Sequence, residues 1–193
     1  MTNLTKRALA DALKELLSRR TLDRITVQDV SDAANVSRKT FYYHFHDIYD
    51  LMEWLVVDEC SHLGNPATGA VDWVREVADA LNYAQENRGW VLNVYQSVER
   101  EQLERILRKI VQPYVEADFD RTVNGRPVDP DDRAFAMDIY TYGLTGLFLN
   151  WVGEGMQGDT VFLEDKLSRL FRNSLEGIAE RCVRQKTNSG ETN

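Results

Sequence analysis

The sequence predicts an all-α protein, and three observations lead to this conclusion. Apolar residues recur at three- and four-residue spacing along most of the chain, no stretch alternates as a half-buried strand would, and clusters of Gly, Asn and Pro separate the periodic segments. The chain has 193 residues, of which 43% are hydrophobic, so it can bury a packed core. We expect a three-helix N-terminal domain over residues 1–47, a second helical domain over residues 48–186, and a disordered polar tail over residues 187–193.

The first predicted helix runs from Leu4 to Arg19. Its apolar residues at helical spacing are Leu9, Ala12, Leu13, Leu16 and Leu17. This stripe is suited to closing a small core against the two helices that follow.

The stretch from Thr26 to Phe45 predicts two short helices joined by a tight turn. Thr26 has the hydroxyl of an N-cap, and Asp29 is a short relative of the capping-box acid. Asn35 stands where the turn needs a residue that tolerates positive φ, and Ser37 can cap the second helix. The pattern is typical of a helix-turn-helix DNA reader.

The second of these helices is unusually polar on its outer side. Phe41 and Phe45 lie about 40° apart on a helical wheel and mark its buried side. The remaining surface carries cations, hydroxyls and rings of the kinds that contact phosphates and base edges: Arg38, Lys39, Thr40, Tyr42, Tyr43 and His44. An ordinary amphipathic helix would not explain so many exposed aromatic side chains.

These residues resemble the DNA-binding domain of the TetR family of bacterial transcription regulators. The resemblance covers residues 4 to about 55 and rests on the first helix, on ITVQDVSDAANVS and on the TFYYHF ending. Within the family, FYYHFHDIYDLMEWL is similar to the branch of dihydroxyacetone-kinase operon regulators. One residue departs from the pattern: many members have a lysine three residues after the HF pair, where this chain has Ile48.

The resemblance implies a role for each polar residue of this domain. Thr40 and Tyr42 would anchor phosphates, while Arg38, Lys39, Tyr43 and His44 would contact base edges or lie near them. Thr26 and Gln28 would face the DNA backbone, with Ser37 at the start of the reading helix. The expected partner is a double-stranded, pseudo-palindromic DNA operator.

The second domain is expected to hold six further helices. They are predicted at about residues 47–63, 71–87, 90–97, 100–122, 131–152 and 161–184, with loops at 64–69, 87–89, 123–130 and 153–159. Pro113 falls inside a helical run, so a kink or a break is expected there.

The last two long helices carry apolar seams that could face the core of the same chain or a second copy. Members of the family pair through these helices into a four-helix bundle, so the resemblance implies a homodimer. The candidate dimerisation residues are Leu144, Leu147, Phe148, Trp151, Leu163, Leu167, Leu170 and Phe171. Two heads on one dimer would address half-sites about 34 to 36 Å apart.

The aromatic residues of the second domain could line a ligand cavity or simply form core. Weak candidates for ligand contact are Trp90, Tyr114, Asp138 and Tyr142, with Asp138 the best polar group in an apolar helix. The scarcity of Lys and Arg in the apolar helix at 131–152 favours a neutral or cationic effector that is partly apolar. A protein co-regulator is the alternative effector, and it would allow the chain to activate transcription.

The distribution of charge, the N-terminal residues and the two cysteines give further expectations about partners, location and redox state. Residues 1–50 hold 8 Lys and Arg against 7 Asp and Glu, whereas the remainder holds 15 against 24, so the acidic excess lies outside the DNA-reading end. The N-terminus has neither a signal peptide nor an anchor, so a cytoplasmic location with no membrane contact is expected. The two cysteines, Cys60 and Cys182, are expected to be free thiols.

No cofactor, bound metal or enzymatic activity is expected. Gly153, Gly155 and Gly158 spell a dinucleotide fingerprint, but no strand precedes it. The cluster Asp58, Glu59, Cys60 and His62 points to several sides of one helix. A helical enzyme or ligand carrier is the alternative from another class, and it offers no catalytic constellation.

Overall fold

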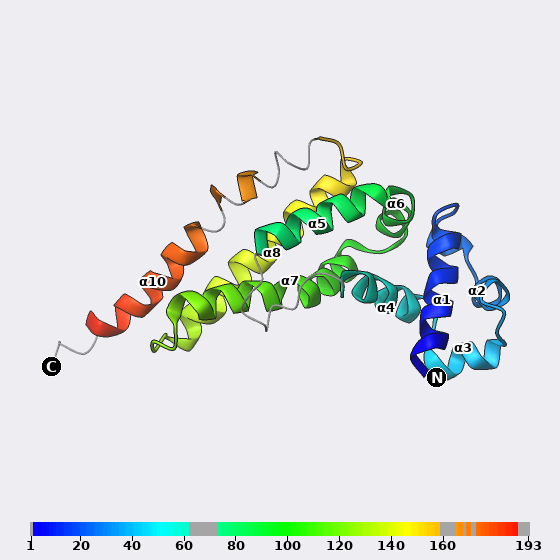
Figure 1. The fold of residues 1–193 in the computed structure, drawn as a ribbon, viewed down its shortest axis with the longest axis horizontal. Coiled ribbons are helices and arrows are strands. Elements are labelled where there is room, and N and C mark those ends of the chain that lie inside the picture. The colour runs from blue at the N-terminus through cyan, green and yellow to red at the C-terminus, as the bar shows by residue number, and fades with distance from the viewer. Residues whose placement is uncertain (1, 62–72, 159–164, 168, 171–172, 189–193) are drawn as a thin grey trace.

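The computed structural model describes residues 2–61, 73–158, 165–167, 169–170 and 173–188. Every regular element in these residues is helical, which confirms the predicted all-α class. The elements are α1 (Thr2–Leu17), the 3-10 turn η1 (Leu22–Arg24), α2 (Val27–Ala33), α3 (Arg38–His44), α4 (Ile48–Cys60), α5 (Trp73–Glu86), α6 (Arg88–Ser97), α7 (Arg100–Val123), α8 (Pro130–Gly153) and α10 (Asn173–Asn188). The molecule is elongated, with α1 to α3 at one end and α10 at the other (Figure 1).

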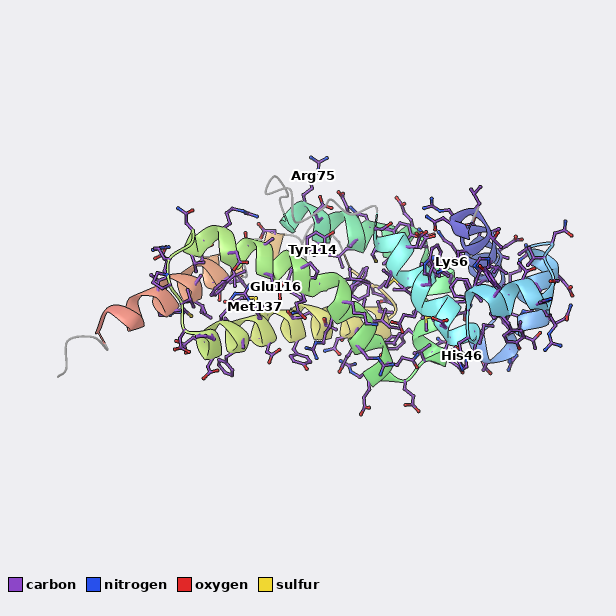
Figure 2. All side chains as sticks on the ribbon, turned by 90° about the horizontal axis from the view of Figure 1, so that it is seen from below. Lys6, His46, Arg75, Tyr114, Glu116 and Met137 are labelled. Atoms are coloured by element: carbon purple, nitrogen blue, oxygen red, sulfur yellow. The ribbon has the colours of Figure 1, made fainter. Side chains whose placement is uncertain are left out.

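Helices α1 to α3, here called the head, enclose a small apolar core. Its fully buried members include Leu9, Leu13, Leu17, Val30 and Phe41, and Phe45 is almost as deeply buried. Lys6 lies at the edge of this core, with Nζ 5.3 Å from the centroid of the Phe45 ring (Figure 2). The three-helix arrangement follows from the two apolar faces that the sequence predicts.

The caps of the two short helices form as their residue types predict. The Thr26 hydroxyl accepts the Asp29 amide at 3.1 Å, and the Asp29 carboxylate accepts the Thr26 amide at 2.8 Å, which makes a reciprocal capping box. Asn35 has φ of 53° in the turn. Ser37 accepts the Thr40 amide at 3.1 Å and begins α3.

The head is packed directly against the rest of the chain, here called the body. Leu51, Met52 and Leu55 of α4 are buried in the same apolar cluster as Leu13 of α1, and this cluster continues to Trp90 of α6. The head and the body therefore share one continuous apolar core across the start of α4.

The body consists largely of α7 and α8, with α10 packed against both (Figure 1). Met137 of α8 and Phe119 of α7 are buried in one apolar cluster of the body (Figure 2). Of the kink or break expected at Pro113, the break does not occur, because α7 continues through this residue. Pro113 is exposed, and the Lys109 carbonyl loses its helical donor to the proline.

The turns around α8 explain the glycines that resembled a dinucleotide fingerprint. A Cβ at Gly153 would lie 2.5 Å from the Tyr95 hydroxyl, and Gly155 and Gly158 have φ of 79° and 105°. These glycines thus serve close packing and turn geometry. The predicted loop at 64–69 and most of the predicted tail lie outside the described residues, although α10 extends through residues 187 and 188.

Candidate functional site

Helix α3 presents its polar and aromatic side chains on the surface of the head. Phe41 is fully buried, whereas Tyr42 is 52% exposed and Tyr43 is 78% exposed. Arg38 and Lys39 are exposed in the first turn, and the Arg38 guanidinium lies 5.9 Å from the Tyr42 ring centroid. The helix therefore offers two cations and two phenols on one accessible face.

The smaller polar residues around α3 have defined local partners. Thr40 and Ser37 share a hydroxyl-hydroxyl hydrogen bond of 2.9 Å, and the Gln28 amide donates to Asp32 at 2.7 Å. The Tyr43 and His44 rings meet edge to face, with centroids 4.9 Å apart. Backbone hydrogen bonds from Thr26 lower the pKa of Asp29, so the capping box holds this carboxylate in its charged form.

Polar contacts join the head to α6 and to α4 of the body. The Leu22 amide donates to Ser97 Oγ at 2.9 Å, and the Asn93 side chain donates to the Leu17 carbonyl at 2.7 Å. Arg7 of α1 pairs with Asp58 of α4 at 3.3 Å. A shift of α4 or α6 would therefore move the head.

A third polar junction was not anticipated from the sequence. Lys14 of α1 donates to Glu59 Oε2 at 2.9 Å and to the Tyr83 hydroxyl at 2.8 Å, while the Tyr83 hydroxyl donates to Glu59. Burial, followed by the Glu59 hydrogen bond and charge, raises the pKa of Tyr83. These residues belong to three helices far apart in sequence, so no local motif indicates the cluster.

The body contains an apolar cavity of about 420 Å³. Its walls come from α4, α5, α6, α7, α8 and α10, and they include Tyr83, Trp90, Tyr95, Tyr114 and Tyr140. Tyr114 of α7 lies in the region between α5 and α7 (Figure 2). Burial, with the charge of Glu76 next, raises the pKa of Tyr114. The size and apolar lining fit a small organic molecule.

Two of the four candidate ligand residues lie outside this cavity. Trp90 and Tyr114 line the cavity, but Asp138 and Tyr142 are on the outer side of α8. Asp138 is 60% exposed and pairs with Arg108 of α7 at 3.9 Å, and Arg108 also donates to the Tyr142 hydroxyl at 2.5 Å. Asp138 therefore faces solvent, pairs with a neighbouring helix and does not line the cavity.

The candidate dimerisation residues divide by their burial. Trp151 is buried, Leu144, Phe148 and Leu167 pack against the core of the body, and Leu147 and Leu170 are exposed. Leu163 and Phe171 lie outside the described residues. Leu144, Phe148, Trp151 and Leu167 thus contribute to the intrachain core, which is one of the two alternatives for the apolar seams, and their role in a dimer stays a prediction.

A different set of α8 residues faces outward. Phe135 is 70% exposed, Ile139 and Tyr142 are about half exposed, and their four- and three-residue spacing places them on one side of the helix. A Cβ at Gly146, one turn further on, would meet nothing within 4 Å. The same spacing was visible in the sequence, but periodicity alone cannot tell which stripe of an apolar helix faces its own core.

The side chains considered as a metal cluster have separate partners. Asp58 pairs with Arg7, Glu59 pairs with Lys14, and Cys60 lines the cavity, while His62 lies outside the described residues. Among the helices that the structure describes, none combines the length and hydropathy required to cross a bilayer.

Comparison with known families gives two matches that together extend over most of the chain. The model described as "Bacterial regulatory proteins, tetR family" matches residues 9–55, which include α2, α3 and most of α1 and α4. The model described as "Transcriptional regulator C-terminal region" matches residues 72–173, more than half of the chain.

A relative in Lactococcus lactis is an HTH-type dhaKLM operon transcriptional activator, DhaS. It is 28% identical over 85 residues, which are 44% of this chain and 46% of that relative, so the chain matches less than half of its length. The solved structure of the dihydroxyacetone kinase operon activator DhaS has a TM-score of 0.67 at 19% identity and covers 93% of this chain and 98% of its own. NalD of Pseudomonas aeruginosa, the secondary repressor of a multidrug efflux pump, has a TM-score of 0.58 at 19% identity, covering 89% of this chain and 97% of its own. At these identities the two structures support the fold.

Proposed function

The chain belongs to the TetR family of bacterial transcription regulators, and from this premise we propose that it is a homodimeric, sequence-specific DNA-binding protein controlled by an effector in its body. It would act in the cytoplasm on a pseudo-palindromic operator. We assign DNA reading to residues 1–47, and effector binding and dimerisation to residues 48–186.

The observation that carries the DNA-binding role is the exposed face of α3. Two tyrosines and two cations stand in solvent on a helix whose opposite side is anchored by Phe41. Exposed aromatic rings bury less apolar surface than core residues do, whereas phenols and cations form hydrogen bonds to phosphates and base edges. In this proposal Thr40 and Tyr42 contact phosphates, and Lys39 and Tyr43 reach into the major groove. Arg38 and His44 lie beside them, and Thr26, Gln28 and Ser37 lie near the DNA backbone.

The cavity supports a small molecule as the effector. Its walls include residues of α4 and α6, the same helices that contact the head. An effector that fits one arrangement of these helices better than another would shift the population between DNA-competent and incompetent states.

A protein co-regulator is the second candidate effector. The exposed apolar stripe of α8 would suit a protein partner, and one relative is described as an activator. The same stripe is the surface on which we place the second copy of the chain. Because the cavity has no other role in this alternative, the small-molecule effector is the better account.

Selection of bound fragments from randomised and genomic DNA with the purified protein tests the proposed function. We expect enrichment of an inverted repeat whose half-site centres are about one helical turn apart. Enrichment of no sequence at moderate salt would contradict the proposal. A repeat with no twofold symmetry would contradict the homodimer while leaving DNA reading intact.

A further inference from the structure

One end of the body cavity lies next to the head, at the cluster of Lys14, Glu59 and Tyr83. Glu59 and Tyr83 both line the cavity, whereas Lys14 comes from α1 of the head. Lys14 and Glu59 side chains are 27% and 16% exposed, so their ion pair is partly shielded from solvent. A ligand that reaches this end of the cavity contacts the groups that hold the head in place.

The described cavity wall carries carboxylates but no Lys, Arg or His. The acidic residues are Glu59, Glu76, Asp79 and Asp118. Arg121 offsets the charge of Asp118 at 2.9 Å, but Arg121 itself is half exposed and is not part of the wall. A buried anion needs a paired cation or several donors, so the wall disfavours an anionic ligand and favours a cationic one.

The ionisable neighbours of the wall respond to the same negative charge. Burial raises the pKa of the Cys60 thiol to about 11, and the Glu59 carboxylate adds to this shift. Glu76 contributes to the raised pKa of Tyr114 in the same way, after burial. Both carboxylates therefore act on groups that line the cavity.

An ammonium group already contacts Glu59 and Tyr83 of the cavity wall. Lys14 Nζ contacts Glu59 and lies 5.3 Å from the Tyr83 ring centroid and 5.8 Å from the Trp90 ring centroid. A carboxylate with two aromatic rings is the environment in which a desolvated organic cation binds well. The surroundings of Lys14 thus show which ligand group would fit there.

On the basis of the proposed function, we propose that the cavity takes an apolar organic amine whose ammonium group replaces that of Lys14 on Glu59. The apolar part of the ligand would fill the space between α5, α7 and α8. Loss of the Lys14 to Glu59 contact would remove one tie between α1 and α4 and shift the position of the head. By linkage, DNA and the amine would then weaken each other's binding by the same factor.

A series of three probes with one apolar body tests the charge preference in the wild-type protein. The probes are 4-phenylbutylamine, 4-phenylbutanol and 4-phenylbutyrate, with binding measured by calorimetry at pH 7. We expect the amine to bind at least about tenfold more tightly than the alcohol, and the carboxylate to bind most weakly. Equal binding of the amine and the alcohol, or preferred binding of the carboxylate, would overturn the proposal.

Two substitutions assign the preference to Glu59. Glu59→Gln is expected to weaken amine binding about tenfold and to leave alcohol binding within about twofold. The matched control is Glu53→Gln on the same helix, because Glu53 pairs with Lys109 at 2.5 Å outside the cavity. An amine affinity that falls equally in both variants, or in neither, would overturn the role of Glu59.

Lys14→Met tests the competition and does not depend on the folding of the Glu59 variant. Removal of the head ammonium leaves Glu59 available, so amine affinity is expected to rise several-fold, and the amine should no longer weaken binding to the selected operator. Unchanged amine affinity would overturn the competition. If the protein binds its operator but prefers the carboxylate probe, this inference fails and the regulator stands. If it prefers the amine but binds no DNA, the proposed function fails and the site stands.

Discussion

At the scale of single residues, the exposed side of α3 separates contacts that position DNA from contacts that read it. Tyr42 flanks the helix with its ring edge against Phe41, and the two ring centroids are 5.5 Å apart. The Tyr42 hydroxyl therefore belongs to a half-exposed ring that rests on the core of the head. Lys39 is exposed in the first turn.

We predict that Tyr42→Phe weakens binding to all DNA sequences by about 1 kcal/mol, the usual scale of a net hydrogen bond. Lys39→Ala should also change which bases are tolerated, because a base contact carries sequence information and a phosphate contact does not. Binding selections with randomised operators measure both effects. Unchanged base preference in Lys39→Ala would remove Lys39 from the readout, and a changed preference in Tyr42→Phe would place Tyr42 in it.

Cys60 gives a second prediction at the residue scale. Because burial raises its pKa to about 11, the thiolate fraction at pH 7.5 should be about 100-fold below that of an ordinary thiol, and only the thiolate is alkylated. Iodoacetamide labelling of a Cys182→Ser variant, followed by mass spectrometry, should show slow reaction that rises tenfold per pH unit up to about pH 10. Urea-unfolded protein is the control and should react at the ordinary rate. Equal rates in the folded and unfolded protein would show that Cys60 is not shielded.

At the scale of elements, short helices depend on their caps because each makes few internal hydrogen bonds. Helices α2 and α3 are seven residues each, and a capping box and a serine cap satisfy their first amides. Asp47 performs the same task for α4, accepting the Tyr49 amide at 2.8 Å and the Asp50 amide at 2.9 Å. This cap fixes the start of the helix that connects the head to the body.

We predict that Asp47→Ala destabilises the protein by about 1 kcal/mol, which corresponds to a melting temperature about 2 to 4 °C lower for a chain of this size. Asp47→Asn is the matched control, since an asparagine oxygen caps nearly as well. Thermal unfolding followed by circular dichroism provides the measurement. If both variants melt equally far below the wild type, the cap contributes through the charge of Asp47 and not through its hydrogen bonds.

At the scale of the whole molecule, the exposed apolar stripe of α8 is the feature that a single chain does not explain. Phe135, Ile139 and Tyr142 expose large apolar side chains along one side of a long helix, which is typical of a protein interface. A second copy packed on this stripe would hold two heads at a fixed separation, as an operator with two half-sites requires.

We predict that Ile139→Glu converts a dimer into a monomer of 22.2 kDa and abolishes tight operator binding without unfolding the chain. Ile139 is 45% exposed, so the new carboxylate would remain in water in the monomer but would be buried in the dimer. Val57→Glu on α4 is the control, because Val57 is apolar, 40% exposed and away from this stripe. Light scattering measures the mass, and a wild-type monomer at micromolar concentration would exclude the dimer.

The sequence by itself determined the head. The Thr26 cap, the positive φ of Asn35, the Ser37 cap and the buried side of α3 all follow from contacts within a few residues, where side-chain chemistry and helical period decide the outcome. The body helices from α4 to α8 were predicted to within a few residues for the same reason. The helix predicted at 161–184 differs, because α10 spans Asn173–Asn188 and part of the predicted range lies outside the described residues.

Only the tertiary structure decided which side of each body helix faces the core. Helix α8 is apolar on most of its surface, so its sequence is compatible with either orientation. Packing against α5 and α6 buried Trp151, while Ile139 was left in solvent. The Lys14, Glu59 and Tyr83 cluster likewise joins residues up to 69 positions apart. Contacts of this kind depend on how helices pack in space, and hydrophobic burial is not directional, so local pattern cannot specify them.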